Sequence, residues 1–154
     1  MISQSFVNDL VRKINILEAR LDNLEQPEMP GWIDWTPVVT QSSTVTASIT
    51  IAKYFQMNGL VYLWVVLGIT GSGVAGNEIV VSGLPFNFDT HGSRVVVGSA
   101  AILDTGTAGY DCLVEAFVVD KVRFLRDSGS VGVSPSFALA SSDIIGFHAT
   151  YKRA

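Results

Sequence analysis

The most informative segment of the chain is residues 58–67, which read NGLVYLWVVL. Asn-Gly is favoured in two-residue β-hairpin turns, because both turn residues must adopt positive φ. After the turn, apolar side chains fall on both faces of the predicted strand at 60–70, so both faces should be covered. One face of a sheet in a domain of this size normally meets water. We therefore expect a neighbouring subunit to cover the second face.

More strands are predicted on both sides of this hairpin. After residue 31, short β-branched and aromatic runs alternate with Gly, Ser, Asn and Asp turns, and no segment shows a sustained helical period free of Gly or Pro. In the last run, Ile145, Phe147, Ala149 and Tyr151 share one face. The sequence thus predicts an all-β fold, an antiparallel β-sandwich of jelly-roll-like form. Its strands are expected at 33–40, 44–57, 60–70, 78–82, 94–103, 111–119, 121–126, 136–140 and 143–152.

Composition narrows the class of protein. The 154 residues are 48% hydrophobic and 16% charged, and the net charge is -4. Disordered chains need low hydrophobicity and high charge, and non-specific nucleic-acid binders are basic, so both classes are disfavoured. The longest apolar run, 60–69, is shorter than the roughly 18–20 residues of a membrane span. We expect no nucleic-acid partner, no membrane insertion and oligomer interfaces that bury apolar surface.

The first 26 residues follow a different pattern and contain neither Gly nor Pro. Their apolar residues recur at alternating spacings of three and four, as in the heptads of a coiled coil. In a parallel assembly, Lys13 and Arg20 at g face Glu18 and Glu25 at e of the neighbouring helix. The alternative is an amphipathic helix packed on its own domain. The predicted interface residues are Val7, Leu10, Ile14, Leu17, Arg20, Leu21, Leu24 and Glu25.

Two segments of this helix bear on the number of chains. Residues 20–25, RLDNLE, resemble the short trimerisation motif Arg-apolar-x-x-apolar-Glu, and residues 13–18, KINILE, are its lysine version. Val and Ile at a with Leu at d also suit two strands, but the motif favours a parallel homotrimer. Pro27 and Pro30 cannot continue a helix. The predicted domains are a coiled-coil oligomerisation helix at 1–26, a Pro-rich linker at 27–31 and a β-sandwich head at 32–154.

Nothing in the sequence indicates an enzyme. Residues 71–76, GSGVAG, match G-x-G-x-x-G, but a dinucleotide site requires a helix next and a predicted strand follows. His91 and His148 lack metal-ligand spacing to each other or to Cys112, the single cysteine. No G-x-S-x-G elbow occurs. We expect no catalysis, cofactor or metal site, structural or surface histidines, and Cys112 as a small buried hydrophobe.

Alternating strand directions predict which loops share an end. Loops held at one end of a rigid scaffold are where recognition usually resides, although they could also be plain turns. The loops expected far from the helix are 41–43, 71–77, 104–110 and 127–135, and the turns expected near it are 58–59, 83–93, 120 and 141–142. The candidate ligand-binding residues in the far loops are Ser72, Asn77, Asp104, Thr107, Tyr110, Asp111, Asp127 and Ser128.

The three tryptophans are expected in different surroundings. Trp32 and Trp35 follow the predicted linker and could form an exposed pair that stacks on sugars. We favour the alternative, in which they seal the base of the head against the helix. Trp64 lies in the apolar run and is expected in the core.

Four short pieces of the β region resemble the C-terminal domains of tailed-phage fibre and minor tail proteins. They are Trp35-Thr36-Pro37, Tyr54 followed by Gly59-Leu60-Val61-Tyr62, Gly83-Leu84-Pro85-Phe86, and Asp143-Ile144-Ile145 followed by Ala149-Thr150-Tyr151. The resemblance implies a trimeric β-sandwich knob on a coiled-coil stalk. It also implies a bacteriophage structural protein, made in the host cytoplasm and placed on the virion exterior, which contacts other virion proteins through its N-terminus. Some members bind host-surface glycans.

These observations predict a non-enzymatic tail-fibre or receptor-binding tip that recognises a host surface glycan. One alternative is a capsid-bound head fibre or decoration protein that binds no receptor. Another, from a different class, is a soluble lectin-like binding module. An enzyme would need carboxylates that converge across the trimer interface, which a sequence does not show.

Overall fold

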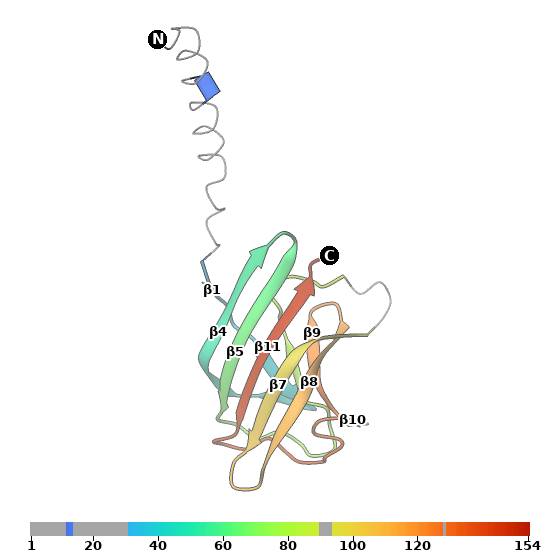
Figure 1. Ribbon diagram of the computed structural model, residues 1–154. Helices are drawn as coiled ribbons and strands as arrows, with labels where there is room; N and C mark the ends of the chain where they lie inside the picture. The colour runs from blue at the N-terminus through green and yellow to red at the C-terminus, as the bar shows by residue number, and fades with distance from the viewer. Residues whose placement is uncertain (1–11, 14–30, 90–93, 128) are drawn as a thin grey trace, which may run out of the picture. The chain divides into compact units, whose positions relative to one another are not determined.

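The computed structural model describes residues 12–13, 31–89, 94–127 and 129–154 (Figure 1). Gly31–Ala154 form one unit. Arg12 and Lys13 are helical and exposed. The other residues predicted for the helix at 1–26, including every predicted interface residue between helices, lie outside the described residues. The coiled coil and the linker therefore stay predictions.

The unit that begins at Gly31 is built from antiparallel strands. They join into one sheet in the order β1-β4-β5-β11-β7-β8-β9-β6-β2-β3, and β10 pairs with β9 beside this path. The prediction of an all-β fold is confirmed. The strands are β1 Ile33–Asp34, β2 Val38–Gln41, β3 Ser43–Val45, β4 Ala47–Met57, β5 Leu60–Ile69, β6 Val80–Ser82, β7 Val95–Asp104, β8 Ala108–Val118, β9 Lys121–Arg126, β10 Gly129–Ser130 and β11 Ile144–Lys152.

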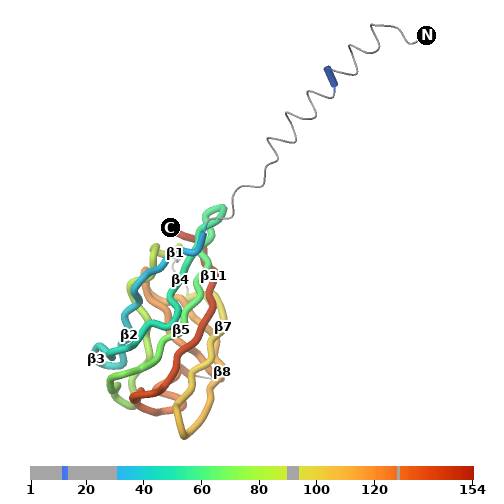
Figure 2. The backbone as a smooth tube through the Cα atoms, turned by 90° about the vertical axis from the view of Figure 1, so that its left-hand side faces the viewer, coloured from blue at the N-terminus to red at the C-terminus, as the bar shows by residue number. Residues whose placement is uncertain are grey.

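The sheet curls around its own core. β1 continues into β2 and β3 continues into β4, although these strands lie at opposite ends of the sheet order. Figure 2 shows β2 and β3 on one side of the unit and β5, β11, β7 and β8 on the other. Two halves of one sheet therefore face each other, and each has one inward and one outward face.

The predicted strands at 33–40 and 44–57 are each broken in two. Ile33 pairs with β4 whereas Val38 pairs with β6, so the chain changes neighbours in between. Pro37 lies at this change and has no N–H for a ladder hydrogen bond. A second change occurs at Thr46, because β3 pairs with β2 and β4 pairs with β5. The β-branched run continues through Thr46, so the hydrophobic pattern did not reveal this break.

The predicted hairpin at Asn58-Gly59 is confirmed. The two residues have φ of 53° and 78°, the positive values that a type I′ turn requires. The turn sets the register of β4 against β5, beginning with Met57 opposite Leu60. This register decides which side chains of β5 point into the core.

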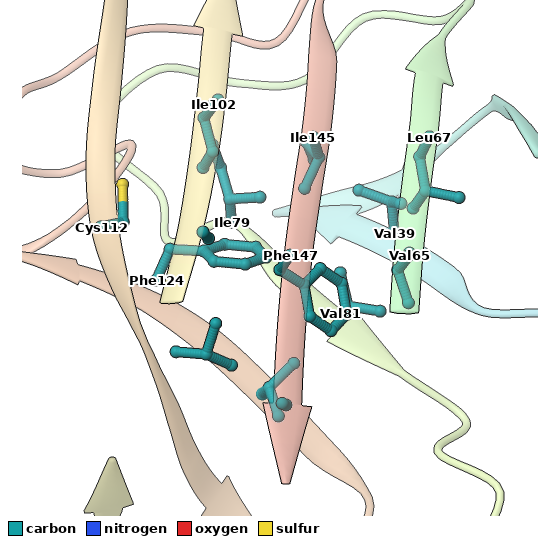
Figure 3. Close-up of a cluster of buried hydrophobic side chains, with 14 of the residues drawn as sticks. Val39, Val65, Leu67, Ile79, Val81, Ile102, Cys112, Phe124, Ile145 and Phe147 are labelled. Atoms are coloured by element: carbon teal, nitrogen blue, oxygen red, sulfur yellow. The ribbon is translucent and has the colours of Figure 1, made fainter. Parts of the chain in front are cut away.

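The core fills the space between the two halves of the sheet. All four β11 residues predicted to share the inward face are buried. Phe147 of β11 meets Phe124 of β9 edge to face, with ring centroids 5.7 Å apart (Figure 3). Cys112 of β8 is also buried there, as predicted. Burying a large apolar side chain contributes about 1.5–3 kcal/mol, so this core is the main driving force for folding.

Residues 136–140 do not form the predicted strand. Their backbone is held by a side chain and a loop instead. The Leu139 N–H donates to Oε1 of Gln41 at 2.8 Å, and its carbonyl accepts from the Gly73 N–H at 2.8 Å. An alternating apolar pattern also arises when a loop covers a core, and Phe137 and Leu139 are buried in this way.

The turn at 141–142 consequently lies at the end opposite to the one predicted. Without a strand at 136–140, the chain does not return before β11 begins. The Thr105 hydroxyl donates to the Ser142 carbonyl at 2.6 Å, which places this turn beside the β7–β8 turn. The prediction from alternating strand directions is wrong for this turn, because it includes a strand at 136–140 that does not form.

Candidate functional site

The connections between strands separate to two ends of the unit. At one end, the Arg153 N–H donates to the Gly59 carbonyl at 3.1 Å and the Leu84 N–H to the Asp120 carbonyl at 3.3 Å. Gly31 begins the unit at this end, because Ile33 pairs with Tyr54 close to the hairpin turn. We call the opposite end the loop end. It consists of residues 41–46, 70–79, 104–108, 127 and 129–143.

Gln41 holds three segments of the loop end together. Its side chain is fully buried, with 0% exposed. Nε2 donates to the carbonyl oxygens of Phe137 at 2.8 Å and Asn77 at 3.2 Å, and Oε1 accepts from the Leu139 N–H at 2.8 Å. A buried polar group with satisfied hydrogen bonds favours one arrangement of its partners. Gln41 therefore fixes the positions of three segments distant in sequence.

Glycines allow the backbone to close around Gln41. A Cβ on Gly73 would overlap Oε1 of Gln41, and a Cβ on Gly132 would overlap the Asn77 carbonyl. Gly132 also has φ of 96°, which side-chain-bearing residues rarely adopt. The Gly-rich segment 71–76 is followed by β6, as predicted, and within it Gly73 packs closely against the buried amide of Gln41.

Asp143 fixes a further part of the loop end. Its carboxylate is buried, and Oδ1 accepts from the Thr105 N–H while Oδ2 accepts from the Ala140 N–H, both at 2.8 Å. Hydrogen bonds to a charged acceptor are among the stronger ones in proteins. The β7–β8 turn is thereby tied to the segment that precedes β11. Together, Gln41 and Asp143 make the loop end a preorganised surface.

The structure places only some of the predicted ligand residues on this surface. Ser72 and Thr107 are exposed there, and Asp104 is half-buried at the end of β7. Asn77 is half-buried, and its amide donates to two carbonyls of its own loop at 3.3 Å. Asn77 therefore shapes the loop. Ser128 lies outside the described residues.

Tyr110 also supports the loop end from within. Its ring stacks on Phe137, with centroids 4.9 Å apart and an interplanar angle of 19°. The Arg126 guanidinium lies over the same ring, 5.5 Å from its centroid. Nε of Arg126 in turn contacts Oδ2 of the exposed Asp127 at 3.5 Å. Asp127 is thus available at the surface, whereas most of the Tyr110 ring is covered.

Asp111 does not face the loops. It lies on the outer face of β8, which belongs to the sheet face turned toward the viewer in Figure 1. Here an open depression of about 510 Å³ crosses β5, β11, β7 and β8, and we call it the trough. Small residues on β7 and β11 form its floor. The outward-facing residues that line it are Trp64, Val66, Ser99, Ala101, Asp111, Gly146 and His148.

An exposed cluster of aromatic rings borders the trough. The Trp32 ring lies 4.7 Å from Phe55 and 6.3 Å from Trp64, Phe55 stacks on Tyr62 at 4.4 Å, and Trp64 stacks on His148 at 5.9 Å. We call these five residues the aromatic ridge. Trp64 is 38% exposed, so its prediction as a core residue is wrong. Trp64 lies on the face opposite to the buried Val61, and because both faces of β5 are apolar the sequence does not show which one is outward.

Trp32 and Trp35 do not form a pair. Trp32 is 45% exposed on the aromatic ridge, whereas Trp35 packs against the core. The interpretation of the two as a joint sugar-stacking pair is therefore wrong. Of the predicted helix against which they were expected to seal the head, the structure describes only Arg12 and Lys13.

A buried ionic cluster lies on the other half of the sheet. Arg123 contacts Oε2 of Glu115 at 2.6 Å and Oε1 of Glu78 at 2.5 Å. The Ser130 hydroxyl donates to Glu78 at 2.8 Å, and the guanidinium lies 4.9 Å from the Phe117 ring centroid. Each charge has a partner, so the cluster ties β8, β9 and β10 to Glu78, two residues before β6. Sequence reasoning missed it, because the partners are far apart in the chain.

The described residues show no metal-binding group of three or more His, Cys, Asp or Glu side chains. His148 is exposed on β11, and His91 lies outside the described residues. The same part of the chain contains no helix that is long and apolar enough to cross a membrane. Comparisons with family models, with curated proteins and with solved structures found no match to this chain.

Proposed function

We propose that this chain is a trimeric, non-enzymatic structural protein of a bacteriophage virion. In this proposal a parallel coiled coil at residues 1–26 carries three jelly-roll-like heads. The loop end of each head recognises a host surface glycan at the tip of a tail fibre. The N-terminus attaches to other virion proteins. The virion class follows from the resemblance to phage fibre and minor tail proteins.

The observation that carries this proposal is the preorganised loop end. It lies at the opposite end of the unit from Gly31, where the predicted stalk enters. A receptor-binding tip needs such polarity, because attachment and recognition must occur at different ends. Rigid loops also lose less conformational entropy on binding, which raises affinity for a given set of contacts.

Three parallel heads would compensate for weak individual sites. Linking binding modules turns each later binding event into an intramolecular one, and avidity can exceed single-site affinity by about 10²–10⁴. Exposed small polar side chains, such as Ser72 and Thr107, suit shallow hydrogen-bonding contact with a polysaccharide. The stalk would keep the three surfaces pointing in one direction.

The second candidate is a capsid-bound head fibre or decoration protein that binds no receptor. The hydrogen bonds of the Asn77 amide and the stacking of Tyr110 on Phe137 favour it, because two of the predicted ligand residues are used to build the loops. A soluble lectin-like module is the third candidate. The fibre tip and the decoration protein would both associate with a virion, whereas the lectin-like module would not, so virion association distinguishes this third candidate.

Screening the full chain against a panel of bacterial surface polysaccharides tests the recognition step. Thr107→Tyr adds bulk to the loop end, and Asn87→Tyr adds the same bulk at the opposite end, where Asn87 is also exposed. We expect the full chain to bind at least one polysaccharide of the panel. Thr107→Tyr should weaken this affinity at least about tenfold, and Asn87→Tyr should leave it unchanged. A trimer that binds no polysaccharide in the panel would favour the decoration protein.

A further inference from the structure

We propose that the aromatic ridge of one copy packs into the trough of the next copy, so that three β units close a ring. The partner is therefore a second copy of this chain. This inference rests on the proposed trimer and adds the surface that joins the heads. Four observations carry it.

The first observation is the composition of the ridge. Trp32, Phe55, Tyr62, Trp64 and His148 gather on one sheet face, and both tryptophans are exposed in the single copy. The cores of protein interfaces are enriched in aromatic residues and depleted in charged ones. Large aromatic side chains also dominate interface hot spots. The ridge has this composition.

The second observation is that ridge and trough lie side by side on one face. Trp64 and His148 belong to both the ridge and the trough. Beyond them, the small residues Ala101 and Gly146 line the floor of the trough. A closed ring of three copies uses a heterologous interface, in which one patch meets a different patch on the neighbour. A raised patch beside a hollow supplies two such surfaces on every copy.

The third observation is the length of chain between the heptads and the β unit. Residues 27–31 span at most about 17 Å when fully extended. If three helices form one coiled coil, the first residues of the three β units therefore lie close together. Trp32 follows directly after this segment, so the aromatic ridges of the three copies begin near the threefold axis.

The fourth observation is the sign of the charges. Lys53 lies beside the ridge, where it pairs with Asp34 at 3.3 Å, and Asp111 lies in the trough. Ridge-to-trough contact brings Lys53 toward Asp111 of the neighbouring copy.

Paired cysteines test this arrangement in the full chain. Phe55→Cys marks the ridge and Ala101→Cys marks the trough. β5 and β11 separate the two strands, so the cysteines of one copy are about 14 Å or more apart and cannot bridge within it. Cys112 is buried and its thiol pKa is raised to about 11, so it does not compete. The two single variants are the matched controls.

Mild oxidation of the double variant should give a covalent trimer on a non-reducing gel, and neither single variant should cross-link. A cross-linked dimer from Phe55→Cys alone would show ridge-to-ridge contact and overturn the inference. A trimeric mass without any cross-link would also overturn it, while the proposed trimer would stand. A monomeric mass would instead remove the proposed trimer itself.

Tryptophan quenching of the unmodified chain provides a test that needs no folded variant. Trp32 and Trp64 should be protected from acrylamide in the trimer, and dissociation by dilution should raise the quenching constant several-fold. Tryptophans that are fully accessible in the trimer would overturn the inference. They would leave the ridge open for another ligand, such as a saccharide.

Discussion

Two of the three hydrogen bonds of Gln41, those to the Phe137 carbonyl and the Leu139 N–H, are buried. Replacing Gln41 with alanine leaves the Leu139 N–H and the Phe137 carbonyl without this partner. A buried unsatisfied group costs about 1–3 kcal/mol, so Gln41→Ala should lower the free energy of unfolding by about 2–4 kcal/mol. Urea unfolding measures this change. Ser43→Ala, at an exposed β3 position, is the control, and equal stabilities for the two variants would contradict the role of Gln41.

Two buried groups should make stability fall at alkaline pH. Burial raises the pKa of the Cys112 thiol from 9.0 to about 11 and that of the Tyr151 hydroxyl from 10.0 to about 12. Above about pH 9 the unfolded chain loses these protons first, so it binds fewer protons than the folded chain and stability falls as pH rises. Below about pH 9 these groups should cause no change.

Urea unfolding at about pH 8 and about pH 10.5 measures this dependence. In the Cys112→Ala variant, the fall in the free energy of unfolding that the thiol causes should disappear, while the fall that Tyr151 causes at higher pH remains. Stability that rises between these two pH values would contradict the assignment.

Among the elements, β7 depends on one glycine. The ladder between β7 and β8 shifts register between Val96 and Gly98. A Cβ on Gly98 would overlap the His148 carbonyl of β11. Gly98→Ala should therefore push the two strands apart and cost about 1–3 kcal/mol, as overpacking usually does.

Gly109→Ala is the matched control, because a Cβ on Gly109 meets nothing within 4 Å. Thermal unfolding of both variants is the measurement. A Gly98→Ala midpoint equal to that of the control would show that β7 and β11 yield easily at this point.

The elements also show what the sequence could predict. β5 and β11 could be predicted because they carry continuous or alternating apolar patterns, and an Asn-Gly turn precedes β5. The alternation of β5 also puts Trp64 and Val61 on opposite faces, but both faces are apolar, so the sequence does not show which one is outward. The contacts of Gln41 could not be predicted, since they join segments up to 98 residues apart. The absence of a strand at 136–140 depends on the same contacts.

At the scale of the whole molecule, the account depends on the outer sheet face being an interface. Within one copy this face leaves two tryptophans exposed beside the trough. Large exposed apolar patches on proteins usually mark interaction sites. The predicted coil and this face are separate reasons to expect self-association, because one comes from the heptads and the other from the β unit, and the number three comes from the heptads alone.

The most direct measurement is the mass of the full chain in solution by light scattering. We predict three times the 16.5 kDa of one chain. Leu17→Ser combined with Leu21→Ser should reduce that mass, because polar residues at these heptad positions remove the apolar seam. A full chain of 16.5 kDa would contradict the trimer, and with it the proposed stalk, the ridge-to-trough ring and the fibre function.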